Sequence, residues 1–157
     1  MLFPFTTRVA TWWLMPGAGS VRRQRGERKY KLPVGFVKTA VLLNLNRAKE
    51  PARGKGELIV TEGYFTVFKL FQYGVENAVA LMGSHLSEQQ KELLVETLGP
   101  QGRVVLLFDN DDAGQAGSAK AAEELINQLF VKVVKLPERV AQPDELTDEE
   151  LQRIVAG

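Results

Sequence analysis

The sequence has 157 residues, 45% of them hydrophobic, so the chain can bury one sizeable core and is too short for two full domains. It has no cysteine and one histidine, which excludes disulfides, a thiolate nucleophile, cysteine-based zinc sites and histidine-rich metal clusters. The net charge of +1 hides a division, because residues 1–55 hold 12 Lys and Arg against two Glu, giving +10, whereas residues 56–157 hold 8 against 17 acids, giving −9.

This asymmetry favours a polyanion near the basic arm and cations near the acidic body, and the alternative is a solvated, charged tail. Without cysteine, a metal would be held by oxygen ligands, which favours magnesium or manganese. No run of about 18 apolar residues is present, and the N-terminus has no small-residue cleavage site. We therefore expect a soluble, cytoplasmic protein with no membrane contact.

From residue 57 onward, short apolar runs alternate with helical patterns. Residues 57–63 predict a first strand, and the helix after it places Val67, Leu70 and Phe71 on one face. Residues 78–83 predict a second buried strand. Ser87 and Gln90 then form a capping box, which opens a helix that stops at Gly99 and Pro100.

The second half of the chain continues this alternation. Residues 103–111 predict the third strand, and residues 131–137 predict the fourth. The helix between them is expected to bury Ala122, Leu125, Ile126 and Leu129. A last short helix has a capping box of Thr147 and Glu150. Because apolar strands alternate with helices, the pattern predicts an α/β fold, a parallel sheet with helices on both faces.

Acidic residues follow two of the predicted strands, at the end of the sheet where sites gather in such folds. If the extended geometry persists beyond the third strand, Asp109 and Asp111 project in the same direction. Glu62 would complete the cluster if the first and third strands are neighbours. Asp112 is interpreted as an ordinary N-cap. The alternative for the other three is that they are solvated carboxylates at loop starts.

The order of motifs "VTEGY", "VALMG" and "FDNDDAG" resembles the toprim domain of bacterial primases, topoisomerases and some nucleases. Within that superfamily the chain resembles the catalytic core of bacterial DNA primases, and we expect it to be a truncated form without zinc-binding or helicase-binding domains. The resemblance implies a toprim, Rossmann-like core of about four parallel strands preceded by a basic segment. We expect an irregular basic segment at 1–28, a primase-like basic segment at 29–55 and the toprim domain at 56–157.

The resemblance implies site residues position by position. Glu62, Asp109 and Asp111 match the family's glutamate and Asp-x-Asp pair, which implies a site for one or two Mg²⁺ or Mn²⁺ ions. Asp144 matches the second acid of an Asp-Pro-Asp and is a further expected metal ligand. The chain departs from the family at two positions, since Gln142 replaces the first of those acids and Thr66 replaces an aspartate common one turn after the glutamate.

The basic residues Lys29, Lys38 and Arg47 match positions that contact template or nucleotide in the family. The expected function is therefore a metal-dependent, primase-type nucleotidyltransferase module acting on single-stranded DNA and nucleotides, with replication or mobile-element proteins as further partners. Paired cations would neutralise charge on the attacked phosphoryl group and the leaving oxygen. The alternative functions are a catalytically weak nucleic-acid-binding remnant and a toprim nuclease. In the leading function, Glu62 would be either a metal ligand or a general acid/base.

The first 28 residues depart from the family pattern completely. Codons compatible with "TWWLMPG" also permit Leu-Val-Ala-Tyr-Ala-Gly in another frame, and primase-like proteins have a similar segment there. We therefore hypothesise that residues 1–28 are a frameshift product and that the frame recovers before Lys29. The nucleotide sequence of the gene tests this hypothesis.

Overall fold

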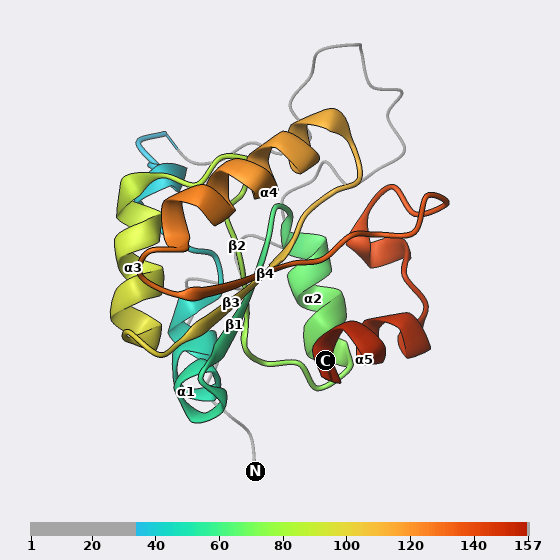
Figure 1. The fold of residues 1–157 in the computed structure, drawn as a ribbon, viewed down its shortest axis with the longest axis horizontal. Coiled ribbons are helices and arrows are strands. Elements are labelled where there is room, and N and C mark those ends of the chain that lie inside the picture. Colours follow the sequence, from blue (N-terminus) through green and yellow to red (C-terminus); the bar gives the residue numbers. More distant parts are fainter. Residues whose placement is uncertain (1–33, 157) are drawn as a thin grey trace. The chain divides into compact units, whose positions relative to one another are not determined.

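Four parallel strands form the centre of the computed structural model, which describes residues 34–156 (Figure 1). The strands are β1 (Glu57–Thr61), β2 (Ala78–Ala80), β3 (Arg103–Leu107) and β4 (Phe130–Val133). Their order in the sheet is β2-β1-β3-β4, and every neighbouring pair is parallel. The predicted α/β class with about four parallel strands is confirmed. The segment predicted at 1–28, with its frameshift hypothesis, lies outside the described residues.

Five α-helices of the described residues surround this sheet. They are α1 (Leu45–Lys55), α2 (Tyr64–Gln72), α3 (Glu88–Leu98), α4 (Asp112–Leu125) and α5 (Asp148–Ala156), with short 3-10 turns η2 (Lys38–Ala40) and η3 (Pro143–Glu145). Helices α1, α3 and α4 cover one face, and α2 and α5 cover the other (Figure 1). The expectation of helices on both faces is therefore confirmed. Within residues 34–156, no helix has the length and apolarity needed to cross a membrane.

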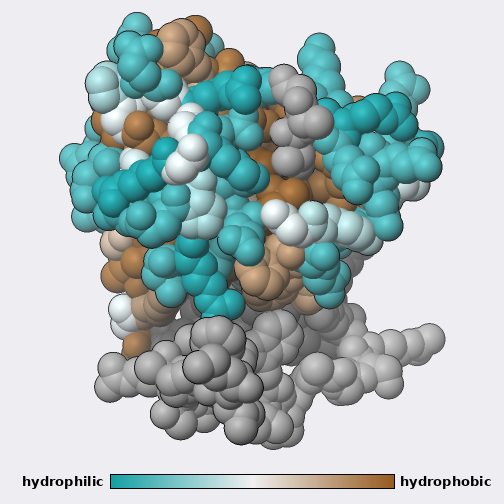
Figure 2. Space-filling view, turned by 90° about the horizontal axis from the view of Figure 1, so that it is seen from below, coloured by the Kyte–Doolittle hydropathy of each residue, from teal (hydrophilic) through white to brown (hydrophobic). Residues whose placement is uncertain are grey.

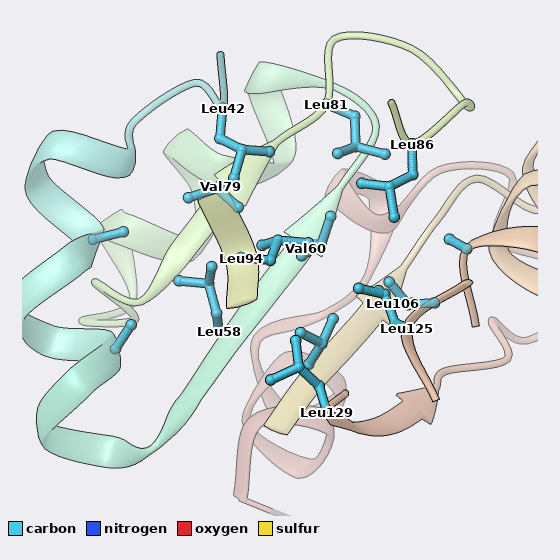
Figure 3. Packing of buried hydrophobic residues seen from close by; sticks show 14 of the residues in the cluster. Leu42, Leu58, Val60, Val79, Leu81, Leu86, Leu94, Leu106, Leu125 and Leu129 are labelled. Atoms are coloured by element: carbon cyan, nitrogen blue, oxygen red, sulfur yellow. The ribbon is translucent and has the colours of Figure 1, made fainter. Parts of the chain in front are cut away.

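The strands divide their side chains between two cores, as their period of two requires. Leu58, Val60 and Leu106 point to one face, where they pack with side chains of α3 and α4 (Figure 3). Ile59 and Val105 belong to the opposite core, with side chains of α2 and α5. All five are at most 2% exposed, which explains why these strands are continuous apolar runs.

The two predicted capping boxes are both present. Ser87 Oγ accepts from the Gln90 backbone N–H at 3.1 Å, and Gln90 Oε1 accepts from the Ser87 N–H at 3.2 Å. Glu150 Oε2 accepts from the Thr147 N–H at 3.0 Å, which starts α5. Each box supplies partners for N–H groups that a helix start leaves without a carbonyl.

Some element boundaries and burial predictions were wrong. The third strand ends at Leu107 and the fourth at Val133, so Asp109 and Asp111 lie in the connection from β3 to α4. Ile126 was expected to be buried but is 67% exposed, because α4 ends at Leu125 and a turn points Ile126 outward. Phe71 is 48% exposed, since Val67 and Leu70 already fill the buried face of α2. Exposed hydrophobic residues of this kind lie among hydrophilic ones on the molecular surface (Figure 2).

Residues 34–55, the described part of the basic segment predicted at 29–55, contribute to the core. Ala48 and Ala52 of α1 are fully buried in the same cluster as Leu58. Their small side chains let α1 pack closely against the sheet and α3. The predicted domain boundary between residues 55 and 56 stays a prediction.

Candidate functional site: an acidic cluster at the carboxyl ends of β1 and β3

Glu62 follows the last residue of β1 and lies beside the end of β3. The two strands pair in register through Thr61 and Leu107, so the residues after them emerge side by side. The Asp109 backbone N–H donates to Glu62 Oε1 at 3.0 Å. The first and third strands are neighbours, so the condition under which Glu62 could join the Asp109 loop is met.

Gly114, in the first turn of α4, lies against both acids. A Cβ atom at this position would lie 2.2 Å from the Asp109 carbonyl oxygen and 2.6 Å from Glu62 Oε1. Only glycine fits so close to another segment's backbone. Sequence reasoning did not assign Gly114 a role, although a glycine early in a helix is a signal of close approach because glycine is a poor helix former.

Asp111 is the N-cap of α4. Its backbone is extended, and its Oδ1 accepts from the Gly114 backbone N–H at 2.7 Å. The prediction that Asp112 is the N-cap was wrong, since Asp112 is the first residue of the helix and is exposed. The cap forms one residue earlier because Asp111 is the last residue with an extended backbone and the helix already begins at Asp112.

Gln142 contacts the second acid directly. Its Nε2 donates to Asp109 Oδ2 at 3.3 Å. The loop that carries Gln142 is joined to the end of β3, because the Asn110 backbone N–H donates to the Ala141 carbonyl at 2.8 Å and Asn110 Nδ2 donates to the Val140 carbonyl at 3.2 Å. Gln142, which the resemblance implies is a departure from the family, therefore lies beside Asp109.

Lys69 of α2 holds the far side of the same loop. Its Nζ donates to the carbonyl oxygens of Asp144, at 2.8 Å, and Leu146, at 2.5 Å. Sequence reasoning missed Lys69, and no local pattern identifies it, since its partners lie 75 and 77 residues away. Asp144, the further expected metal ligand, lies in η3, and its role as a ligand stays a prediction.

The three acids influence one another electrostatically. The pKa of Glu62 is raised above its ordinary value, chiefly because partial burial disfavours the charged carboxylate. The hydrogen bond from the Asp109 backbone N–H works in the opposite direction. The negative charges of Asp109 and Asp111 raise the pKa of Glu62 further, which indicates that a cation placed among the three would be attracted.

The donor chemistry fits a hard divalent cation. Carboxylate oxygens are ligands that Mg²⁺ and Mn²⁺ accept, and Mg²⁺ keeps several waters while binding one or two carboxylates directly. In the part of the chain that the structure describes, no group of three or more His, Cys, Asp or Glu side chains is arranged to surround an ion. The arrangement thus fits a hydrated ion held by one or two carboxylates, and not a closed protein cage.

The residues predicted to contact nucleic acid are only partly described. Lys38 is exposed, and its Nζ donates to the Met82 carbonyl at 3.2 Å. Arg47 of α1 is exposed, and no side-chain partner for it exists among the described residues. Lys29 lies outside them. The nucleic-acid interface therefore stays a prediction.

Comparisons with known proteins identify relatives of this fold. A model of the toprim domain matches residues 56–136. The chain is 34% identical over 115 residues to the DNA primase of Thermotoga maritima, covering 73% of this chain and 20% of that protein. It is 37% identical over 126 residues to the DNA primase of Aquifex aeolicus, covering 76% of this chain and 24% of that protein. The chain thus spans about a fifth of the length of these relatives.

Solved structures give the same result. The zinc-binding and RNA polymerase domains of the Aquifex aeolicus primase match with a TM-score of 0.69 and 34% identity, over 85% of this chain and 34% of that one. A primase catalytic domain solved bound to single-stranded DNA matches with a TM-score of 0.63 and 26% identity, over 77% of this chain and 39% of that one. The chain therefore belongs to the toprim domain family, and DNA primases are its relatives within that family.

Proposed function

We propose that the chain is a metal-dependent, primase-type nucleotidyltransferase module that acts on single-stranded DNA. The observation that carries the proposal is the hydrogen bond from the Asp109 backbone N–H to Glu62 Oε1. It sets two acids together at the carboxyl ends of adjacent parallel strands, where α/β folds bind ligands. The related primases, one of them solved with single-stranded DNA, support the class of substrate.

The acids have distinct roles in this proposal. Asp109 and Asp111 would anchor Mg²⁺ or Mn²⁺ at the end of the sheet. Glu62, which is partly buried, either binds the ion or exchanges a proton with the attacking hydroxyl. When bound, the cation would neutralise charge on the attacked phosphoryl group and on the leaving oxygen.

The basic residues would bind the backbone of the template. Neutralising Z phosphates makes the logarithm of the binding constant fall with the logarithm of salt at a slope near −0.7Z for single strands. Replacing Lys29, Lys38 or Arg47 with alanine should reduce this slope by about 0.7 for each phosphate contact that is lost. Lys120→Ala is the control, because that exposed lysine lies on α4 and is paired with Glu124.

A primer-synthesis assay on single-stranded DNA, with magnesium and with manganese, tests the function directly. We expect Glu62→Gln, Asp109→Asn and Asp111→Asn to lose synthesis while retaining DNA binding, since ion positioning acts mainly on the transition state. Asp112→Asn is the matched control, because it removes the same charge from an exposed neighbour in α4.

The same assay separates the alternatives. Salt-dependent DNA binding without synthesis in either metal would identify a nucleic-acid-binding remnant. DNA cleavage products would identify a nuclease. Failure of the parent to bind any nucleic acid at low salt would remove all three functions. Replication or mobile-element proteins remain proposed partners.

A further inference from the structure

Asn110 stands between the two aspartates that are proposed to hold the cation, and both ends of its side-chain amide are bonded. Its Nδ2 donates to the Val140 carbonyl at 3.2 Å and, over a longer 3.4 Å, to the Pro137 carbonyl. Its Oδ1 accepts from Gln115 Nε2 at 3.3 Å. Because the two carbonyls can only accept, the nitrogen end of the amide must face them, so this pattern sets the orientation of the group.

The backbone of Asn110 makes a further bond to the same loop. Its N–H donates to the Ala141 carbonyl at 2.8 Å. The Asp109 N–H and the Asp111 side chain bond to other segments of the chain. Asn110 therefore joins the connection between β3 and α4 to residues 137–141, which follow β4.

Residues 137–141 are held in turn by the core. Val140 is 1% exposed and belongs to the same buried cluster as Leu107, the last residue of β3. The Val140 N–H donates to the Pro137 carbonyl at 2.9 Å, which closes a turn. This turn is a fixed point of the fold, and Asn110 fastens the two acids to it.

An uncharged amide is the side chain that this contact requires. An aspartate at position 110 would turn a carboxylate oxygen toward the two carbonyl oxygens, and it would add a third negative charge beside the pair of acids. An alanine would offer no donor. Asn110 thus supplies donors to the turn without adding to the repulsion between its neighbours.

Order in the connection before an ion arrives favours binding of the ion. If the connection moved freely, Asp109 and Asp111 would have to be ordered at the moment of binding, and the entropy lost would weaken it. Because Asn110 is bonded to the turn, that ordering is part of folding. The affinity for the ion is then expected to depend on a residue that carries no charge.

We propose that Asn110 is a positioning residue, which holds Asp109 and Asp111 in place for a divalent cation by bonding the connection between them to the turn at 137–141. The inference rests on the proposed metal-dependent function and deepens it by assigning a residue that prepares the site. In this role Asn110 acts through the two acids and does not touch the ion.

The test is a titration of the full chain with Mn²⁺, followed by the electron paramagnetic resonance signal of the free ion. Asn110→Ala removes both side-chain bonds to the turn and leaves the charge unchanged. We expect it to weaken Mn²⁺ binding by about three- to tenfold, the equivalent of one net hydrogen bond. Asn127→Ala is the matched control, because Asn127 is exposed between α4 and β4, and this variant should bind Mn²⁺ as the parent does.

Amide hydrogen exchange separates this role from a merely structural one. The ion and the bonds of Asn110 favour the same arrangement, so Mn²⁺ should slow exchange of the Asn110 amide in the parent. In Asn110→Ala, the amide at position 110 should exchange faster than in the parent. A merely structural role would leave the Mn²⁺ affinity of the folded variant unchanged.

Equal Mn²⁺ affinity in folded Asn110→Ala would overturn the inference and leave the proposed function standing. An Asn110 amide whose exchange in the parent does not respond to Mn²⁺ would overturn it as well, and this measurement needs no variant. Mn²⁺ binding that persists in the double variant Asp109→Asn, Asp111→Asn would place the ion elsewhere and overturn it too. No Mn²⁺ bound to the parent would overturn both the inference and the metal-dependent function.

Discussion

Replacing Gly114 with alanine is the sharpest test of how the acidic cluster is built. The added Cβ would lie 2.2 Å from the Asp109 carbonyl oxygen, and ordinary van der Waals contact begins at 3.4 Å, so one of the two must move by about 1.2 Å. The obstacle is backbone that pairs with neighbouring segments and not the end of a flexible side chain. Helix α4 must therefore shift, or the loop after β3 must, and either change separates Glu62 from Asp109.

The expected cost follows from two opposing terms. Overpacking of this kind destabilises by about 1–3 kcal/mol. Alanine is a better helix former than glycine by about 1 kcal/mol, which offsets part of the cost. We therefore expect Gly114→Ala to lower the free energy of unfolding by up to about 2 kcal/mol.

Gly54→Ala is the matched control. Gly54 is also inside a helix, α1, and its added Cβ would meet nothing within 4 Å. This variant should gain about 0.5–1 kcal/mol, so the two variants should differ by about 2 kcal/mol in urea denaturation. If Gly114→Ala is as stable as Gly54→Ala, the close approach of α4 to the two acids is wrong.

Two further predictions concern the C-terminal part of the chain. The pKa of Glu150 is lowered to about 2 by the Thr147 backbone N–H and by Arg139, so its contribution to stability should be fully present above pH 4.5 and be lost as the pH falls to about 2. Urea midpoints across that range should fall in the parent and change less in Glu150→Gln. Lys69→Met should cost about 1–3 kcal/mol, because it leaves two carbonyls without their donor, and amide hydrogen exchange of the 140–147 loop should become faster. Unchanged exchange would show that Lys69 does not hold the loop.

Elements with strong local signals were predictable. The capping box of Ser87 and Gln90 is a contiguous pattern, and it formed as expected. The buried strands were recognisable because both faces of a covered parallel sheet require apolar residues. Glu62 and the Asp109 loop were placed at one end of the sheet because parallel strands end at the same edge, and their adjacency then depended only on strand order.

The details of the site depend on contacts that no local pattern encodes. Asp111 and Asp112 are chemically equal candidates for the N-cap, and the point at which β3 stops decided between them. Ile126 continues the helical period of α4 but falls after the helix ends, so periodicity alone placed it in the core. The hydrogen bond between Gln142 and Asp109 spans 33 residues and requires the folded sheet.

The strand order has a consequence for the order of folding. Strand β1 is made first but lies between β2 and β3, so it has no partner on either side until residues 78–80 and then 103–107 have been synthesised. The contacts that complete the acidic cluster come later still, because the carbonyls that Lys69 binds lie 75 and 77 residues after it. Non-local pairings of this kind form slowly, since loop closure precedes any gain from the contact. A nascent chain therefore forms its sheet before its acidic cluster is complete. A chain released before residue 146 would lack a carbonyl through which Lys69 holds the loop that carries Gln142.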